Sequence, residues 1–195
     1  MTDRCPWCKD DELYCHYHDT EWGVPLSDDQ QLFEFLSLES AQAGLSWITI
    51  LRKRENYRTA YKQFDINKVA RFNAASVEKL LANPGIVRNR AKIEASIHNA
   101  KLFIDIQHKH DSFAGFYWRY VDGKPIQNKR RSLREVPATT ELSDKIARDF
   151  KKLGFKFLGS TTIYAFMQAT GMVNDHIVSC HRYETCRELG QGFKV

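Results

Sequence analysis

The sequence contains no uninterrupted run of about 18 or more apolar residues, which is the length that a membrane-spanning helix requires. Its opening residues, MTDRCPWC, lack the apolar core of a secretory signal peptide. The alternation of apolar and polar residues that indicates β-strands is also nearly absent. These absences argue against a membrane protein, a secreted protein and a β-rich fold, and we expect a cytoplasmic protein.

The composition is that of an ordinary globular protein. Of the 195 residues, 43% are hydrophobic and 27% are charged, and a chain of this length can bury a core without cross-links. We expect one domain over residues 1–195, either a single body or two small helical lobes. Lys and Arg number 29 against 24 Asp and Glu, and the net charge of +5 gives modest support for a nucleic-acid partner.

Helical spacing of apolar residues dominates the interior of the chain, so the predicted fold class is all-α. Ile93, Ile97 and Ile104, for example, fall on one face of a helix. Gly154 is a suitable residue to end a helix, and 122–140 is the one long irregular connection. The predicted helices cover 28–38, 46–61, 67–72, 76–81, 90–107, 112–121, 142–153 and 161–170.

Three cysteines and two histidines are crowded into the stretch CPWCKDDELYCHYHD near the start of the chain. A disulfide framework is disfavoured, because five cysteines are an odd number and the cytosol is reducing. A redox dithiol at Cys5 and Cys8 would need a strand before it, and only four residues precede Cys5. Zinc prefers cysteine and histidine ligands, although His16 and His18 are too close in sequence for a local finger.

A second group of potential ligands lies near the other end of the chain, in NDHIVSCHRYETC. His176 and Cys180 are four residues apart and share one face if this segment is helical. Cys5 and His18 would complete a Cys₂His₂ tetrahedron that joins the two ends of the chain. The alternative is a set of scattered buried thiols and surface imidazoles, but the presence of clusters at both ends favours zinc.

The stretch LLANPGIVRNRAKIEASI predicts two helices joined by a tight turn at Pro84 and Gly85. Backbone N–H groups at such a turn can bind an anion, and Arg88, Arg90 and Lys92 add positive charge. The pattern is similar to a helix-hairpin-helix, which binds the DNA backbone; the alternative is an ordinary helical corner with a solvated basic face. A second basic group in the long connection is more typical of a solvated loop: Lys129, Arg130, Arg131 and Arg134.

One carboxylate and several aromatic residues are candidates for a binding pocket. Glu39 stands in LESAQAGLSWITIL, an otherwise small and apolar run that also supplies Trp47. CHYHDTEWGVP supplies Tyr17 and Trp22. Aromatic faces can enclose a planar base, and a carboxylate can accept its hydrogen bonds or oppose its positive charge. The alternative is that these are core aromatics beside a surface glutamate.

Taken together, the motifs resemble the 3-methyladenine DNA glycosylase I family from Cys5 to about Cys180. The blocks that carry the resemblance are YHDTEWGVP, LESAQAGLSWITILRKRENYR, GIVRNRAKI, GFKFLGSTTIYAFMQATGMVNDH and the cysteine after them. One departure lies in the hairpin, where Val87 occupies a position at which a second glycine is typical of helix-hairpin-helix proteins. The resemblance leaves 181–195 as a variable tail.

The resemblance implies one structural zinc ion held by Cys5, His18, His176 and Cys180. The remaining thiols and imidazoles at the two ends do not fall on ligand positions of the family, although Cys8 is near enough to Cys5 to replace a ligand. These remaining residues are Cys8, Cys15, His16, His181 and Cys186.

The resemblance also implies a monomeric, monofunctional glycosylase that hydrolyses 3-methyladenine from double-stranded DNA and leaves an abasic site. Glu39 would be the catalytic or base-recognising carboxylate, and no lysine stands out as a Schiff-base nucleophile. Leu45 would fill the gap left by the flipped nucleotide. The pocket residues would be Tyr14, Tyr17, Trp22, Glu39 and Trp47, and the DNA contacts Leu45, Gly85, Arg88, Arg90 and Lys92. The alternative function is a non-catalytic, zinc-stabilised module that binds distorted duplex.

Overall fold

Polar side chains fix the starts of most helices in the computed structural model of the protein, which describes residues 3–195. The carboxylates of Asp11 and Asp28 accept hydrogen bonds from the free backbone N–H groups of the helices that follow them. The side chains of Asn73 and Asn89 cap the two helices that flank the predicted hairpin. Gly154 ends its helix in the left-handed conformation, with φ of 98°.

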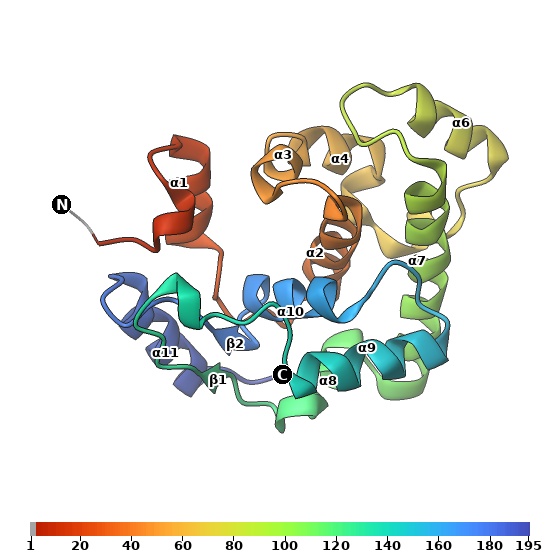
Figure 1. The fold of residues 1–195 in the computed structure, drawn as a ribbon. Coiled ribbons are helices and arrows are strands. Elements are labelled where there is room, and N and C mark those ends of the chain that lie inside the picture. Colours follow the sequence, from red (N-terminus) through yellow and green to blue (C-terminus); the bar gives the residue numbers. More distant parts are fainter. Residues whose placement is uncertain (1–2) are drawn as a thin grey trace.

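The structure is predominantly helical, as predicted, with two short parallel strands (Figure 1). No helix within 3–195 is long and apolar enough to cross a membrane. The α-helices are α1 (Glu12–Thr20), α2 (Asp29–Gln42), α3 (Trp47–Leu51), α4 (Arg54–Ala60), α5 (Ile66–Ala70), α6 (Ala74–Ala82), α7 (Arg90–His110), α8 (Phe113–Trp118), α9 (Glu141–Leu153), α10 (Ser160–Ala169) and α11 (Arg182–Gly192). The 3-10 turns are η1 (Pro6–Cys8), η2 (Lys62–Phe64), η3 (Arg119–Val121) and η4 (Leu133–Glu135), and the strands are β1 (Ile126–Gln127) and β2 (Val173–Asn174).

One prediction about helices was wrong, and one condition attached to the predicted metal site is not met. The single helix predicted over 46–61 is divided into α3 and α4, because the Lys53 N–H bonds to the Ile50 carbonyl three residues back and tightens the chain into a turn. The segment with His176 and Cys180 is a series of turns after β2 and not a helix; the Cys180 N–H donates to the Ile177 carbonyl.

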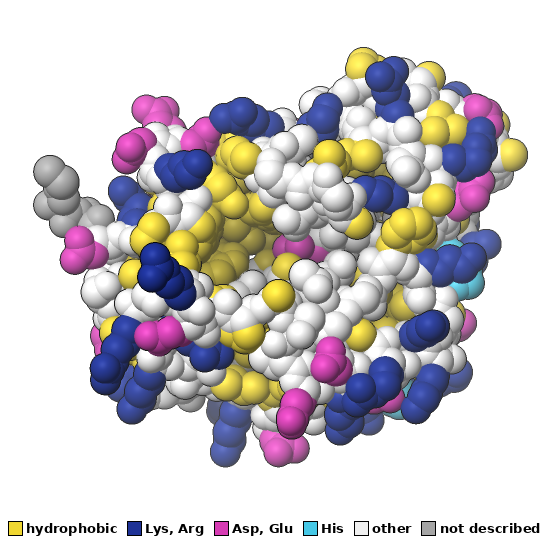
Figure 2. Space-filling view, in the orientation of Figure 1, with side chains coloured by type: hydrophobic (Ala, Val, Ile, Leu, Met, Phe, Trp, Pro, Cys, Tyr) yellow, Lys and Arg dark blue, Asp and Glu magenta, His cyan; other side chains and the backbone are white. Residues whose placement is uncertain are grey.

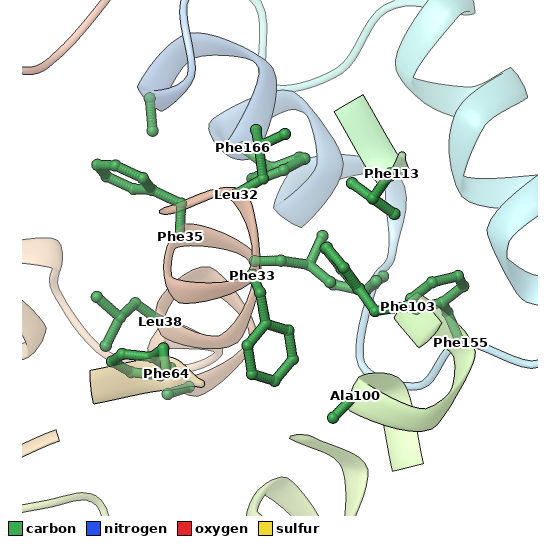
Figure 3. Packing of buried hydrophobic residues seen from close by; sticks show 14 of the residues in the cluster. Leu32, Phe33, Phe35, Leu38, Phe64, Ala100, Phe103, Phe113, Phe155 and Phe166 are labelled. Atoms are coloured by element: carbon green, nitrogen blue, oxygen red, sulfur yellow. The ribbon is translucent and has the colours of Figure 1, made fainter. Parts of the chain in front are cut away.

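Helix α2 lies at the centre of the core and is buried on all sides from residue 32 to residue 41. Figure 3 shows Leu32, Phe33, Phe35 and Leu38 pointing in different directions from this helix. The Phe33 ring, for example, meets Phe103 edge-on at a centroid distance of 5.2 Å. Because the whole helix is enclosed, any polar residue near its C-terminal end is carried into the interior.

The two ends of the chain meet beside α10. The Gly23 and Leu26 N–H groups donate to carbonyls at the C-terminal end of α10, and the His181 N–H donates to the Asp3 carbonyl. Gly171, with φ of 68°, allows this approach, since a Cβ there would lie 2.4 Å from the backbone of Val24. The segment before α2 is thereby held against the segment that carries His176 and Cys180.

Candidate functional site

A cavity of about 370 Å³ opens between α1, α2, α3 and α10. Figure 2 shows it as a hollow in the surface whose wall is largely hydrophobic. Its volume is in the range of pockets for small ligands. Its lining residues are Trp7, Tyr14, Tyr17, Trp22, Glu39, Gln42, Trp47, Leu133, Val136, Ala165, Gln168 and Asp175.

The structure brings all five predicted pocket residues together in this cavity and adds Trp7 to them. The Tyr17 and Trp47 rings lie 5.5 Å apart, and both are buried. Trp7 joins the other aromatic residues, with ring centroids 4.8 Å from Tyr14 and 5.0 Å from Trp22. These rings form a continuous aromatic wall against which a planar group can stack.

The carboxyl group of Glu39 faces this wall without a protein partner. Its side chain is only 5% exposed, and no donor within residues 3–195 forms a hydrogen bond or ion pair with it. Burial raises its pKa to about 8. Glu34, on the same helix and 7% exposed, is instead paired with Arg54 and Arg58. The core therefore neutralises one of its two buried glutamates and leaves the other available to a ligand.

The raised pKa has a consequence for stability. Between pH 4.5, the ordinary pKa of the group, and about 8, the unfolded chain releases a proton that native Glu39 keeps, so the free energy of unfolding falls as pH rises through this range. We expect Glu39→Gln to raise the free energy of unfolding of the ligand-free protein by a few kcal/mol at pH 8, because each unit of pKa shift is worth about 1.4 kcal/mol. Near pH 4.5 the substitution should change the free energy of unfolding little. Denaturant unfolding at both pH values measures the difference.

Glu34→Gln is the matched control for this stability prediction. It removes the same charge from the same helix, but it breaks the buried ion pair with Arg54 and leaves that guanidinium with Glu21 as its remaining carboxylate partner, so it should destabilise the protein. An equal stabilisation by Glu39→Gln at pH 4.5 and at pH 8 would show that the effect comes from packing and not from ionisation.

Asp175, which also lines the cavity, is the centre of a hydrogen-bond network. Its buried carboxylate accepts hydrogen bonds from the Tyr164 hydroxyl, the Gln168 amide at 2.9 Å and the Asn128 amide at 2.7 Å. The next residue is His176. Asp175 therefore joins the wall of the cavity to the segment that carries His176 and Cys180. No local pattern in the sequence indicates this link.

Cys5, His18, His176 and Cys180 form a buried cluster beside the cavity. Their four potential ligand atoms all lie within 4.8 Å of one another. The Cys180 sulfur is 3.4 Å from Nε2 of His18 and 3.5 Å from Nδ1 of His176, and the Cys5 sulfur is 3.6 Å from the same Nδ1. A tetrahedral zinc ion with ordinary Zn–S and Zn–N bonds places such atoms about 3.6 Å apart, so the four residues fit this metal.

The other nitrogen of each histidine is held by a hydrogen-bond acceptor. His18 Nδ1 is 2.7 Å from the Asp19 carboxylate, which Arg4 holds in turn, and His176 Nε2 donates to the Trp22 carbonyl at 2.9 Å. Such contacts orient metal-binding histidines. A hydrogen bond from the Cys5 thiol lowers the pKa of Cys180 and favours its thiolate, and the same contact raises the pKa of Cys5, because the two sulfurs share one proton.

Cys8, the possible substitute ligand, is not a member of this cluster. Its thiol donates to the Cys5 carbonyl at 3.2 Å, and the Cys15 thiol donates to the Lys9 carbonyl. His181 lies nearby, and its Nε2 is 3.4 Å from the Asp19 carboxylate. All five cysteines are free thiols.

The hairpin between α6 and α7 occupies residues 83–89, close to the predicted position. Arg88 is exposed and forms no ion pair within the part of the chain that the structure describes. Arg90 is paired with Glu78 at 2.6 Å. The Gly85 N–H is already bonded to the Asn83 side chain. Of these hairpin groups, Arg88 is therefore the one that is free to meet a phosphate.

Lys92 has a partner on a different element. Its ammonium donates to the Ala41 carbonyl at 2.9 Å and the Ala43 carbonyl at 2.6 Å, at the C-terminal end of α2. Lys92 thus fixes the loop that follows α2 to the first turn of α7. This loop carries Leu45, which is 42% exposed beside a second cavity that shares Glu39 and Gln42 with the first.

The helical fold places an aromatic cavity around an unpaired carboxyl group, next to a Cys₂His₂ cluster, and such a cavity is suited to a planar group. Comparison with known proteins gives its family. The model of the methyladenine glycosylase family matches residues 7–183. The chain therefore belongs to the methyladenine glycosylase family.

Individual relatives are similar over nearly their whole length. The chain is 48% identical to a DNA-3-methyladenine glycosylase of Haemophilus influenzae, over 92% of this chain and 97% of the relative, and 48% identical to DNA-3-methyladenine glycosylase 1 of Escherichia coli, over 93% and 97%. A solved structure from Staphylococcus aureus, which concerns 3-methyladenine recognition by 3-methyladenine DNA glycosylase I, superposes with a TM-score of 0.90 at 37% identity and covers 93% of this chain and 97% of its own.

Proposed function

We propose that this protein is a DNA repair enzyme that hydrolyses the N-glycosidic bond of 3-methyladenine in alkylated double-stranded DNA and leaves an abasic site. The observation that carries the proposal is the unpaired, buried carboxyl group of Glu39 in the aromatic cavity. The relatives named above are glycosylases of this specificity, and one solved relative, 37% identical with a TM-score of 0.90 over 92% of this chain and 97% of its own, is a complex with 3-methyladenine.

The chemistry of the substrate explains why one carboxyl group is sufficient. A methyl group on N3 gives the adenine of the nucleotide a positive charge, and breaking the glycosidic bond releases a neutral base. Such a leaving group needs little protonation, so the protein must mainly extract the base from the stack and hold it. The aromatic wall stacks on the base, and Glu39 in its ionised form stabilises the cation and accepts its N–H groups.

We infer that the Cys₂His₂ cluster holds one structural zinc ion. The distances between its four ligand atoms, their complete burial and the oriented histidines support this inference. Four protein ligands leave no open position for a water molecule, so zinc would join the two ends of the chain and take no part in hydrolysis.

We infer further that the α6–α7 hairpin binds duplex in the manner of a helix-hairpin-helix, with Arg88 against a phosphate. Leu45 would enter the duplex where the nucleotide is flipped out. Its exposure and its place beside Glu39 and Gln42 support this role.

The test of the proposed function is release of 3-methyladenine from methylated duplex DNA, measured chromatographically with the purified protein. A product strand that contains an abasic site, without strand cleavage, is the expected result. Tight binding to distorted duplex with no base release would instead support the alternative function, a non-catalytic binding module.

Trp47→Ala is expected to weaken the binding of free 3-methyladenine and of free adenine alike, by roughly 1–3 kcal/mol, which is typical of loss of one stacking face. Titration of the protein with each base measures the effect. Trp47→Phe, which keeps an aromatic face, is the matched control and should retain most of the affinity. A loss confined to 3-methyladenine would show that Trp47 selects the methylated base and does more than stack on it.

A further inference from the structure

The long connection between β1 and α9 passes the mouth of the base cavity. Leu133 and Val136 from this connection are part of the cavity lining, although they are far from the other lining residues in sequence. We refer to residues 128–136, which include η4, as the strap. Figure 1 shows the strap approaching the space between α1 and α10 from the side opposite to α3 and the α6–α7 hairpin.

The strap is fixed to residues 175–178 by hydrogen bonds. The Asn128 side chain donates to Asp175 at 2.7 Å, and the Arg130 carbonyl accepts from the Val178 N–H at 2.8 Å. The Arg130 guanidinium lies 3.5 Å from the Asp175 carboxylate. The pairing of β1 with β2 holds the residues just before the strap. Its position beside the cavity is therefore set by the segment that also carries His176.

The outer side of the strap is basic, and its charges are unpaired. Lys129, Arg131 and Arg134 are exposed, and none of them forms an ion pair with a carboxylate anywhere in residues 3–195. Glu135, the one acidic residue of the strap, accepts a hydrogen bond from the Arg131 backbone N–H. Three free cations thus lie next to an aromatic cavity, and in Figure 2 Lys and Arg side chains border the hollow.

We propose that the strap is a phosphate-binding surface for the DNA strand that carries the flipped nucleotide, with Lys129, Arg131 and Arg134 against its backbone. The inference rests on the proposed glycosylase function. A nucleotide whose base fills the cavity must leave its flanking phosphates at the mouth, where the strap lies. The hairpin would then hold the duplex on one side of the flipped nucleotide and the strap on the other. Leu133 on the strap would contact the base or sugar from the cavity side.

Salt dependence of binding tests this proposal. Each phosphate neutralised by a cation contributes about 0.9 to the slope of log K against log salt concentration. The triple variant K129Q/R131Q/R134Q should therefore bind a duplex that contains a stable abasic-site analogue with a slope smaller by about 2.7. Between 50 and 200 mM salt, the wild type should then lose about 40-fold more affinity than the variant. Fluorescence anisotropy with labelled duplex gives both slopes.

The matched control is K101Q/K109Q/K145Q, which removes three exposed charges from α7 and α9, away from both cavities. Its slope should stay close to that of the wild type. Equal slopes for the wild type and the strap variant would overturn the proposal. A decrease in slope in the control variant as large as that in the strap variant would overturn it as well. Binding of free 3-methyladenine should be unchanged in both variants, which shows that they are folded. Base release by the wild type is measured in parallel, so a failure of the glycosylase function is distinguished from a failure of the strap proposal.

Discussion

Glu39→Gln is expected to lower kcat/KM for release of 3-methyladenine from methylated duplex by about 30-fold to 5,000-fold, because loss of one partner of a buried charged contact costs about 2–5 kcal/mol. The substitution keeps the shape of the side chain and removes its charge. The affinity for free 3-methyladenine should fall as well, with a smaller loss for adenine. Chromatography of the released base gives the rates, and titration gives the two affinities.

The pH profile separates electrostatics from shape. Below the pKa of about 8, the carboxyl group of the free protein is neutral and must release its proton when a cationic base binds. Activity of the wild type should therefore rise with pH up to about 8 and then level off, while the Gln variant should lack this rise. Equal loss of affinity for both bases in the variant would contradict the role of the charge, and selectivity would then have to come from the shape of the cavity.

Removal of zinc is expected to cause the largest loss of stability. Structural zinc contributes about 10–16 kcal/mol in small zinc-finger peptides; because this protein has a large core of its own, we expect a smaller loss of roughly 5 kcal/mol. For a chain of this size, that corresponds to a decrease in Tm of roughly 10–20 °C. Chelation followed by thermal unfolding measures it, and Cys180→Ser should reproduce it. An unchanged Tm in a sample shown to be metal-free would contradict the inference.

Two further cysteine variants serve as controls for the zinc experiment. Cys186→Ser alters a buried thiol outside the cluster and should keep one zinc per chain by elemental analysis. Cys8→Ser should keep it as well. Loss of zinc from the Cys8 variant would show that the set of ligands is different, although the site itself would remain.

Local patterns in the sequence were sufficient to predict the helices that have clear capping residues and a helical spacing of apolar residues. The prediction of a helix over 90–107 agrees with α7, since Asn89 caps it and Ile93 and Ile97 are buried one turn apart. Helices α1 and α11 were not predicted, because cysteine, histidine and charged residues take about half of their positions and hide the apolar period. The division of 46–61 depends on a single hydrogen bond of Lys53, which spacing does not indicate.

The candidate site was predictable where the residues belong to dense local motifs. Glu39 and Trp47 stand close together in one such motif. Trp7 was not predicted to line the cavity, because it lies between Cys5 and Cys8, in a stretch whose pattern indicates metal chemistry. The contact of Lys92 with the end of α2 joins residues about fifty positions apart, and only the folded chain brings them together. The position of the strap beside the cavity likewise appears only in the folded chain.

The meeting of the two chain ends has a consequence for biosynthesis. The aromatic wall is made largely by residues 7–47, which leave the ribosome first, but Cys5 and His18 meet their partners only when residues 176–180 have been made. Domains generally fold as units during synthesis, and contacts between distant residues form late. We therefore expect a nascent chain that ends before His176 to have an open, incomplete cavity. The competence to bind a base would then be acquired only when nearly the whole chain has been translated.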